Sequence, residues 1–380
     1  MRILVTSTPG AGHIHPVLPL ALALRARGHD LVWATGPSSC RGIEAFGIET
    51  RPAGPDAGPR NVRFAALAGH LSQLAPRDRR REAMPIMFGN LSAPVMRDAL
   101  RPLFDELRPD LVIHEVAELA AAPLASSRGI PHVTVAFSDV VAPDVTERVA
   151  DSVAPLWMDE GLAPPSDAGW FDHVYLHPFP PSMSTPHAQL TPMRPVAVPA
   201  AVADRPSWLD GFGRDRPGIY VTFGTEVGLH GPWQPLLTAL AAIDADVVAT
   251  IGNAAVADVL GVTPSNVRVE AWVPQSLLLE RAVLVVSHAG AGTLIAAAAA
   301  GVQQLCVPIA ADQWDNADAL ARANAGEVAE MNERTADDLA LMVRELLAGA
   351  CDEGARSVAE EIAAMPTPGE IVPTLEKLVE

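Results

Sequence analysis

The stretch Ser287-His288-Ala289-Gly290-Ala291-Gly292-Thr293 follows an apolar run, Ala282 to Val286, and precedes an alanine-rich run, Leu294 to Ala300. The first run is typical of a buried parallel strand, and the second favours a helix. A helix N-terminus directly after a strand and a glycine turn binds anions, because its first N–H groups lack partners and its dipole favours negative charge. We therefore expect a diphosphate at this turn, held by His288, Gly290, Gly292 and Thr293.

A second strand–turn–helix pattern opens the chain. Ile3 to Val5 reads as a strand, Gly10 to Gly12 as a turn and Val17 to Arg27 as a helix, and Leu31 to Ala34 begins the next strand. Further apolar runs predict strands at 111–113, 133–137, 219–223, 247–251, 267–270, 283–286 and 305–309. The chain is thus predicted to be α/β, with two doubly wound, Rossmann-like domains and a ligand in the cleft between them.

Three segments break this regularity. Residues 178–206 are dense in proline and are predicted to form a semi-rigid linker between the domains. Residues 52–95 and 140–175 are rich in Pro, Gly, Met and Trp, so we expect irregular segments there that carry substrate contacts.

The amino-acid composition of the chain argues against several classes of function. With 27 Lys and Arg against 45 Asp and Glu, the net charge of −18 argues against nucleic acid or an anionic membrane as a partner. The three cysteines are far apart, without CxxC spacing, which favours free thiols over a disulfide frame or a zinc site. No signal peptide or apolar run long enough to span a membrane is present. We expect a soluble cytoplasmic protein; a homodimer is left open.

Three blocks in order resemble the family 1 glycosyltransferases, and more narrowly the actinobacterial enzymes that attach deoxysugars to antibiotic aglycones. The blocks are residues 9–16 (PGAGHIHP), 108–115 (RPDLVIHE) and 272–316, which includes Trp272-Val273-Pro274-Gln275 and Ala311-Asp312-Gln313. The resemblance covers residues 1 to about 370. It implies the GT-B fold, with an acceptor domain at 1–200, a nucleotide-sugar domain at 201–365 and a last helix, 366–380, that packs back on the first domain.

The resemblance assigns the catalytic residues. His13 would be the general base, since an imidazole can accept a proton near neutral pH. Glu115 would orient that ring and stabilise its charged form, although His114 and Glu118 compete for this role. The alternatives are an exposed turn histidine and a solvated loop carboxylate. His13 and His15 also suggest a metal, but no third ligand has suitable spacing, so no metal or other cofactor is expected.

The donor residues follow from the same resemblance. His288, Gly290, Gly292, Thr293 and Thr225 would hold the diphosphate, with helix capping as the alternative for Thr225. Trp272 would stack on the nucleobase or else be a core side chain, while Val273 and Gln275 would lie near the nucleoside. Asp312 and Gln313 would bind sugar hydroxyls, and Trp314 and Asn316 would shape the same wall. The sequence departs from the family pattern at Ser287, often a histidine, and at Ala289, often a glycine.

The sequence lacks one residue that bears on the choice of nucleotide-sugar donor. Relatives that use uridine donors commonly have a glutamate eight residues after the phosphate histidine, where it grips both ribose hydroxyls; here that residue is Ala296. By resemblance this favours a dTDP-linked, deoxygenated sugar, with a UDP-sugar as the alternative. Apolar side chains of the irregular segments suggest a hydrophobic natural-product acceptor, and those assigned to it are Met84, Phe88, Trp157 and Trp170.

The expected reaction is a single inverting displacement at the anomeric carbon. Three other classes fit less well. An epimerase would need a set of carboxylates around the sugar. An NAD(P) oxidoreductase would need a third glycine at position 15, where His15 stands. A non-catalytic activator or binding protein of the same fold would be expected to lack the base and the phosphate residues.

Overall fold

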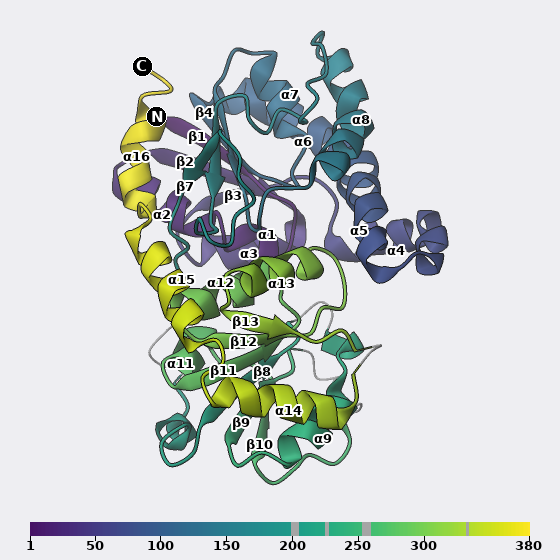
Figure 1. Ribbon diagram of the computed structural model, residues 1–380. Helices are drawn as coiled ribbons and strands as arrows, with labels where there is room; N and C mark the ends of the chain where they lie inside the picture. Colours follow the sequence, from purple (N-terminus) through teal and green to yellow (C-terminus); the bar gives the residue numbers. More distant parts are fainter. Residues whose placement is uncertain (199–204, 225–227, 253–259, 332–333) are drawn as a thin grey trace. The chain divides into compact units, whose positions relative to one another are not determined.

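A computed structural model of the protein describes all residues except 199–204, 225–227, 253–259 and 332–333 (Figure 1). The chain forms two compact units. The first comprises Met1–Pro178, Thr185–Val196 and Pro366–Glu380, and the second comprises Phe179–Ser184 and Ala197–Met365. The boundary expected near residue 200 falls among residues outside the description, while 179–184 belong to the second unit.

The first unit is built on a seven-stranded sheet in the order β3-β2-β1-β4-β5-β6-β7, with every neighbouring pair parallel. Its strands are β1 Arg2–Thr6, β2 Asp30–Thr35, β3 Glu49–Pro52, β4 Leu111–Glu115, β5 His132–Val135, β6 Val174–His177 and β7 Leu190–Pro192. The apolar residues of β1 and β4 are buried, as a parallel sheet covered on both faces requires. The strand order reverses between β1 and β4, which makes their carboxyl ends the switch point where such sheets bind ligands.

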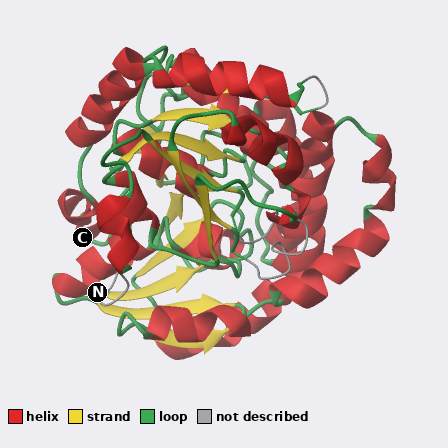
Figure 2. Ribbon diagram, turned by 90° about the horizontal axis from the view of Figure 1, so that it is seen from below, coloured by secondary structure: helices red, strands yellow, loops and turns green. Residues whose placement is uncertain are grey.

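Helices lie on both faces of this sheet (Figure 2). They are α1 Ala11–Ile14, α2 Leu18–Ala26, α3 Pro37–Glu44, α4 Ala57–Leu67, α5 Pro76–Met84, α6 Ala93–Leu107, α7 Ala121–Ser126, α8 Pro143–Asp159 and α16 Pro368–Glu376, with the short 3₁₀ helix η1 Gly69–Gln73 and the π-helix η2 Pro85–Ser92. The C-terminal helix α16 packs against α2 (Figure 1). There Glu376 accepts a hydrogen bond from Arg27 and lies 3.0 Å from Nε2 of His29.

The segments expected to be irregular are in large part helical, so that prediction was wrong. Residues 52–95 contain α4, α5 and η2, and residues 140–175 contain the long helix α8. Proline misled the prediction because Pro143 stands at the first position of α8, where a missing N–H removes no hydrogen bond. The proline-rich segment 178–206 is likewise no simple linker, since β7 within it pairs with β6 at the edge of the sheet.

The second unit repeats the architecture with a six-stranded parallel sheet in the order β10-β9-β8-β11-β12-β13. Its strands are β8 Gly218–Thr222, β9 Asp246–Thr250, β10 Val267–Glu270, β11 Ala282–Ser287, β12 Gln303–Cys306 and β13 Gly326–Val328. Its helices are α9 Trp233–Ala241, α11 Gln275–Leu279, α12 Ala291–Ala299, α13 Gln313–Arg322, α14 Ala336–Leu347 and α15 Asp352–Ala364, with the 3₁₀ helices η4 Ser207–Gly211 and η5 Gly228–His230. The switch point lies between β8 and β11.

The predicted α/β class with two Rossmann-like sheets is confirmed. The apolar runs located five of the six strands of the second unit: β10 has the predicted bounds, β12 begins two residues earlier than expected, and β13 was not predicted. In the described part of the chain, no helix is both long and apolar enough to cross a membrane.

Candidate active site

The first site lies at the switch point of the first unit. His13 is on α1, directly after β1, and Glu115 is the last residue of β4. Because β1 and β4 pair in register, with Thr6 opposite His114, the two side chains meet. Nδ1 of His13 lies 3.2 Å from Oε1 of Glu115, with 17% of the His13 side chain exposed and none of Glu115. The ring N–H is not aligned well enough for a hydrogen bond, as is common before substrate binds.

Glu115 is held by a set of donors. Its Oε1 accepts hydrogen bonds from the backbone N–H and the hydroxyl of Thr8, at 3.1 and 2.8 Å, and its Oε2 accepts one from the N–H of Ala117 at 2.6 Å. Burial acts to raise the pKa of Glu115, but the charge of His13 and these donors outweigh it, so the pKa lies below its usual value. Glu115 therefore faces His13 as a carboxylate.

The two competing candidates have other partners. Nε2 of His114 lies 3.1 Å from Nδ1 of His132, and burial lowers the pKa of His114 to about 3. Glu118 accepts hydrogen bonds from the hydroxyl of Thr6 at 2.6 Å and the N–H of Ala120 at 2.8 Å. Burial raises its pKa to about 7, so it is a partly protonated acid at neutral pH. Of the three candidates, Glu115 is the one in ion-pair contact with His13.

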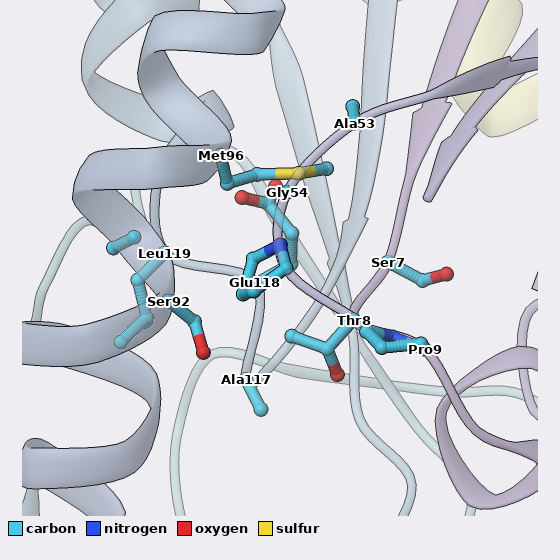
Figure 3. Close-up of a pocket in the computed structure, with 12 residues that line it drawn as sticks. Ser7, Thr8, Pro9, Ala53, Gly54, Ser92, Met96, Ala117, Glu118 and Leu119 are labelled. Carbon is cyan, nitrogen blue, oxygen red and sulfur yellow. The ribbon is translucent and has the colours of Figure 1, made fainter. Parts of the chain in front are cut away.

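A small cavity lined by Thr8 and Glu118 has a volume of about 10 Å³, which is room for about one water molecule. Figure 3 shows Thr8 and Pro9, from the turn after β1, on one side of Glu118, and Ser92 and Met96 on the other. Thr8 lines this cavity together with Glu118, and its hydroxyl donates a hydrogen bond to Glu115. Thr8 therefore lies near both buried acids.

Aromatic side chains flank His13. The rings of Phe88 and Phe137 meet its imidazole edge-on, with centroids 5.5 and 5.1 Å away. Phe88 comes from η2, and the guanidinium of Arg60 lies over its ring, 5.5 Å from the centroid. Sequence reasoning missed Phe137, whose signal was its place two residues after the end of β5. Met84, Trp157 and Trp170, grouped with Phe88 as acceptor residues, are buried in the core of the first unit.

The second site lies at the switch point of the second unit, where His288 follows β11. The residue is 9% exposed, and its ring packs against two glycines. A Cβ atom added at Gly290 would lie 2.4 Å from Nε2 of His288, and one added at Gly224 would lie 3.0 Å from its Cε1. Burial lowers the pKa of His288, while the charge of Asp312 acts in the opposite direction. The ring is therefore neutral at neutral pH and confined to one position.

The helix that follows offers free N–H groups. Gly290 is the N-cap of α12, and Gly292 and Thr293 are in its first turn, partly or fully exposed. The first N–H groups of a helix have no partner within it, so they point at whatever binds there. Thr225, assigned to the same phosphate, lies outside the described residues.

The turn after β12 carries the pair expected to bind sugar. Oε1 of Gln313 accepts hydrogen bonds from the N–H groups of Ile309 and Ala310, both at 2.7 Å, so this oxygen shapes the turn. Oδ2 of Asp312 accepts a hydrogen bond from Nδ2 of Asn316 at 2.9 Å.

Three nucleoside candidates lie at and just after the end of β10. Trp272 is 63% exposed, which rules out the core alternative. Val273 is buried, and Gln275 is the first residue of α11. In the described part of the chain, no group of three or more His, Cys, Asp or Glu is arranged to hold a metal ion.

Comparisons with known proteins agree with this architecture. Residues 234–378 match the family described as erythromycin biosynthesis protein CIII-like, C-terminal domain. The chain is 32% identical to the elloramycin glycosyltransferase ElmGT of Streptomyces olivaceus, over 99% of this chain and 97% of that protein. It is 31% identical to the TDP-daunosamine transferase DnrS of Streptomyces peucetius, over 100% and 97%. The crystal structure of the glycosyltransferase VinC in complex with dTDP superposes with a TM-score of 0.80, at 29% identity, over 100% of this chain and 99% of that one.

The two Rossmann-like units and these relatives together show that the chain is a glycosyltransferase of the GT-B fold. The chain belongs to the family of glycosyltransferases of antibiotic biosynthesis that includes these relatives.

Proposed function

We propose that the enzyme transfers a deoxysugar from a dTDP-sugar to a hydroxyl group of a hydrophobic natural product, with inversion at the anomeric carbon. The observation that supports this most strongly is the pairing of His13 with the buried carboxylate of Glu115. A partly exposed imidazole backed by a fixed negative charge is the arrangement required for a general base.

His13 and Glu115 divide the acid–base work. Because Nδ1 faces Glu115, the carboxylate favours the tautomer with its proton on that atom and leaves Nε2 to accept. The acceptor hydroxyl gives its proton to Nε2 as its oxygen bonds the anomeric carbon. The bond from that carbon to the diphosphate breaks in the same step, so the configuration inverts. Glu115 then stabilises the imidazolium that forms.

Negative charge develops on the departing dTDP, and groups of the second unit would stabilise it. We assign its diphosphate to the N-terminus of α12, with Gly290, Gly292, Thr293 and the ring of His288, and to Thr225. Backbone N–H groups and a helix dipole stabilise a developing anion without reorganisation. Because these groups suffice for charge compensation, the proposed reaction uses no metal and no other cofactor.

Specificity is assigned to the residues around these centres. The exposed ring of Trp272 would stack on the nucleobase, with Val273 and Gln275 near the nucleoside. Asp312 and the amide nitrogen of Gln313 would bind the sugar. Ala296, in place of a ribose-gripping glutamate, favours dTDP over UDP, and the relatives named for TDP-daunosamine and solved with dTDP support the same choice. The rings that flank His13 would contact the acceptor.

The test is calorimetric titration with dTDP and with UDP, in EDTA, on the wild type and on His288→Ala. We expect dTDP to bind more tightly than UDP, and the variant to lose that binding. Preference for UDP would overturn the choice of donor but not the fold or family. If the folded protein bound neither nucleotide, the chain would be a non-catalytic member of its family.

A further inference from the structure

Asn316, on α13, connects two turns that the proposed donor site uses. Its side chain is fully buried. Its Nδ2 donates hydrogen bonds to the carbonyl oxygen of Ala289 at 3.1 Å and to Oδ2 of Asp312 at 2.9 Å. Both protons of the amide nitrogen therefore have acceptors, one in the turn after β11 and one in the turn after β12. Its Oδ1 is buried without a hydrogen-bond partner among the described residues.

The bond to Ala289 fixes the orientation of a peptide plane. The C=O and N–H of a trans peptide point in opposite directions, and the described chain has no cis bond. Because Asn316 holds the carbonyl of Ala289, the N–H of Gly290 in the same peptide must point away from Asn316. The N–H of Ala289 is fixed as well, since it donates to Oγ of Ser287 at 3.1 Å. Neither peptide flanking Ala289 can then turn without breaking a hydrogen bond.

This orientation bears on anion binding. Gly290 is the N-cap of α12, so its N–H is one of the groups that the proposed diphosphate would use. A donor that already points at the ligand costs no reorganisation during the reaction, whereas a peptide free to rotate would spend part of its time with a carbonyl facing the anion.

We propose that Asn316 is a positioning residue for sugar transfer, which orients the Gly290 N–H toward the donor diphosphate and fixes the Asp312 carboxylate that holds the sugar. This inference rests on the proposed function. It explains why an amide stands here: a carboxylate at this position could not donate to either acceptor, and an aliphatic side chain would leave both turns unconnected.

The test compares Asn316→Ala with a matched control, Gln303→Ala. Gln303 is also a buried amide of the second unit with two hydrogen bonds: it donates to the carbonyl of Leu346 and accepts from the N–H of Cys351. Gln303→Ala thus also removes two hydrogen bonds of a buried amide, but Gln303 lies away from the donor turns. Binding of dTDP is measured by calorimetry, and binding of thymidine, which lacks phosphate, by competition.

We expect Asn316→Ala to bind dTDP about tenfold more weakly, the effect of one lost charge-assisted hydrogen bond. Thymidine binding should stay within about twofold of the wild type, and Gln303→Ala should change neither. The kcat with the dTDP-sugar should fall further than the KM rises, since leaving-group charge is greatest in the transition state. Equal loss of dTDP and thymidine binding, or unchanged dTDP binding in the folded variant, would overturn the proposal.

Two further measurements keep the result interpretable. If Asn316→Ala does not fold, ¹⁵N-glycine labelling of the wild type applies: the Gly290 N–H resonance should move on saturation with dTDP, and an unmoved resonance contradicts the inference. His288→Ala separates this proposal from the proposed function. If His288→Ala loses dTDP while Asn316→Ala does not, the positioning role fails alone; if neither loses dTDP, the donor site itself is wrong.

Discussion

The turn after β1 and the turn after β11 occupy the same place in their sheets, yet they are built for different chemistry. Each follows a buried strand at a switch point, and each carries a histidine among glycines. In the first turn the imidazole is partly exposed, with a buried carboxylate 3.2 Å away. In the second turn the ring is confined between two glycines and a nine-residue helix begins directly behind it.

The surroundings of the histidine, rather than the turn itself, set its role. A carboxylate at Nδ1 directs the other nitrogen outward and stabilises the imidazolium once a proton is taken up, which suits proton transfer. Burial lowers the pKa of His288 even though the charge of Asp312 opposes it, so this ring stays neutral and can act as a fixed hydrogen-bonding group. The four-residue helix α1 offers little dipole, whereas α12 offers a full first turn of N–H groups. The same strand–turn–helix arrangement thus carries the proposed base in one unit and the proposed anion-binding turn in the other.

The largest expected effect separates the two histidines. His13→Ala should lower kcat by about 10²- to 10⁴-fold, because it removes the general base. Its affinity for dTDP should not change, since dTDP is assigned to the second unit. Steady-state kinetics and calorimetry measure both quantities on one preparation. If His13→Ala kept nearly full activity, or lost dTDP binding, the contrast between the two turns would be wrong.

The buried acid behind the first turn predicts a pH effect on stability. Burial raises the pKa of Glu118 to about 7, from an ordinary value near 4.5. The contribution of Glu118 to the free energy of unfolding is therefore fully present below about pH 4.5. It is lost as the pH rises through 7, when the carboxyl ionises in the folded protein. The loss is on the order of 3 kcal/mol. Glu118→Gln, which cannot ionise, should gain stability relative to the wild type between pH 5 and 8.

Thermal unfolding at pH 5 and pH 8 measures this difference. The control is Glu147→Gln, because Glu147 is an exposed residue of α8 and its change should shift both midpoints alike. If the gap between Glu118→Gln and the wild type were the same at both pH values, Glu118 would not titrate near neutrality in the folded protein.

A third prediction addresses the second turn. Gly290→Ala places a methyl group 2.4 Å from Nε2 of His288, so the ring or the turn must move. We expect dTDP affinity to fall about 10- to 100-fold, which corresponds to roughly one or two hydrogen bonds to a charged ligand. Gly292→Ala is the matched control for the protein, since a methyl group there meets nothing within 4 Å. Calorimetry with both variants distinguishes strain in the protein from a clash with the ligand.

Much of the fold could be predicted from the sequence. Apolar runs bounded by glycine and proline located the strands, because a parallel strand buried on both faces has a simple composition. Four short strands of three or four residues, β3, β6, β7 and β13, were not predicted, and two proline-rich segments were misjudged. Pro143 looked like a breaker and instead begins α8, while β7 was hidden in a proline-rich segment because an edge strand tolerates proline.

The site was harder to predict, because contacts depend on side-chain direction. Motif spacing indicated His13 and His288 and favoured Glu115, with His114 and Glu118 as competitors. The register of β4 against β1 shows that Glu115 is the one that lies against His13. Phe137 carried no motif at all. Asn316 was expected only to shape a wall, since its two hydrogen bonds join turns that are far apart in the sequence.

The smallest expected effect concerns backbone strain in the two turns. Ala289 has φ +60°, a left-handed conformation that costs a non-glycine residue about 1 kcal/mol. Ala289→Gly removes that cost. It also removes a buried methyl group worth about 0.8 kcal/mol and gives the unfolded chain about 0.5–1 kcal/mol of entropy. These terms nearly cancel, so the stability should stay within about 1 kcal/mol of the wild type.

Gly10 in the first turn has φ +122° and ψ +147°, a region open in practice to glycine alone. Gly10→Ala should therefore destabilise the protein by about 1–3 kcal/mol, more than Ala289→Gly changes it in either direction. Thermal unfolding of the two variants beside the wild type measures both. Equal destabilisation of the two variants would mean that the second turn depends on its Ala289 methyl group as much as the first turn depends on its glycine. A near-zero shift for Ala289→Gly alone would mean that the bonds to Ser287 and Asn316, not a glycine, hold the second turn in its conformation.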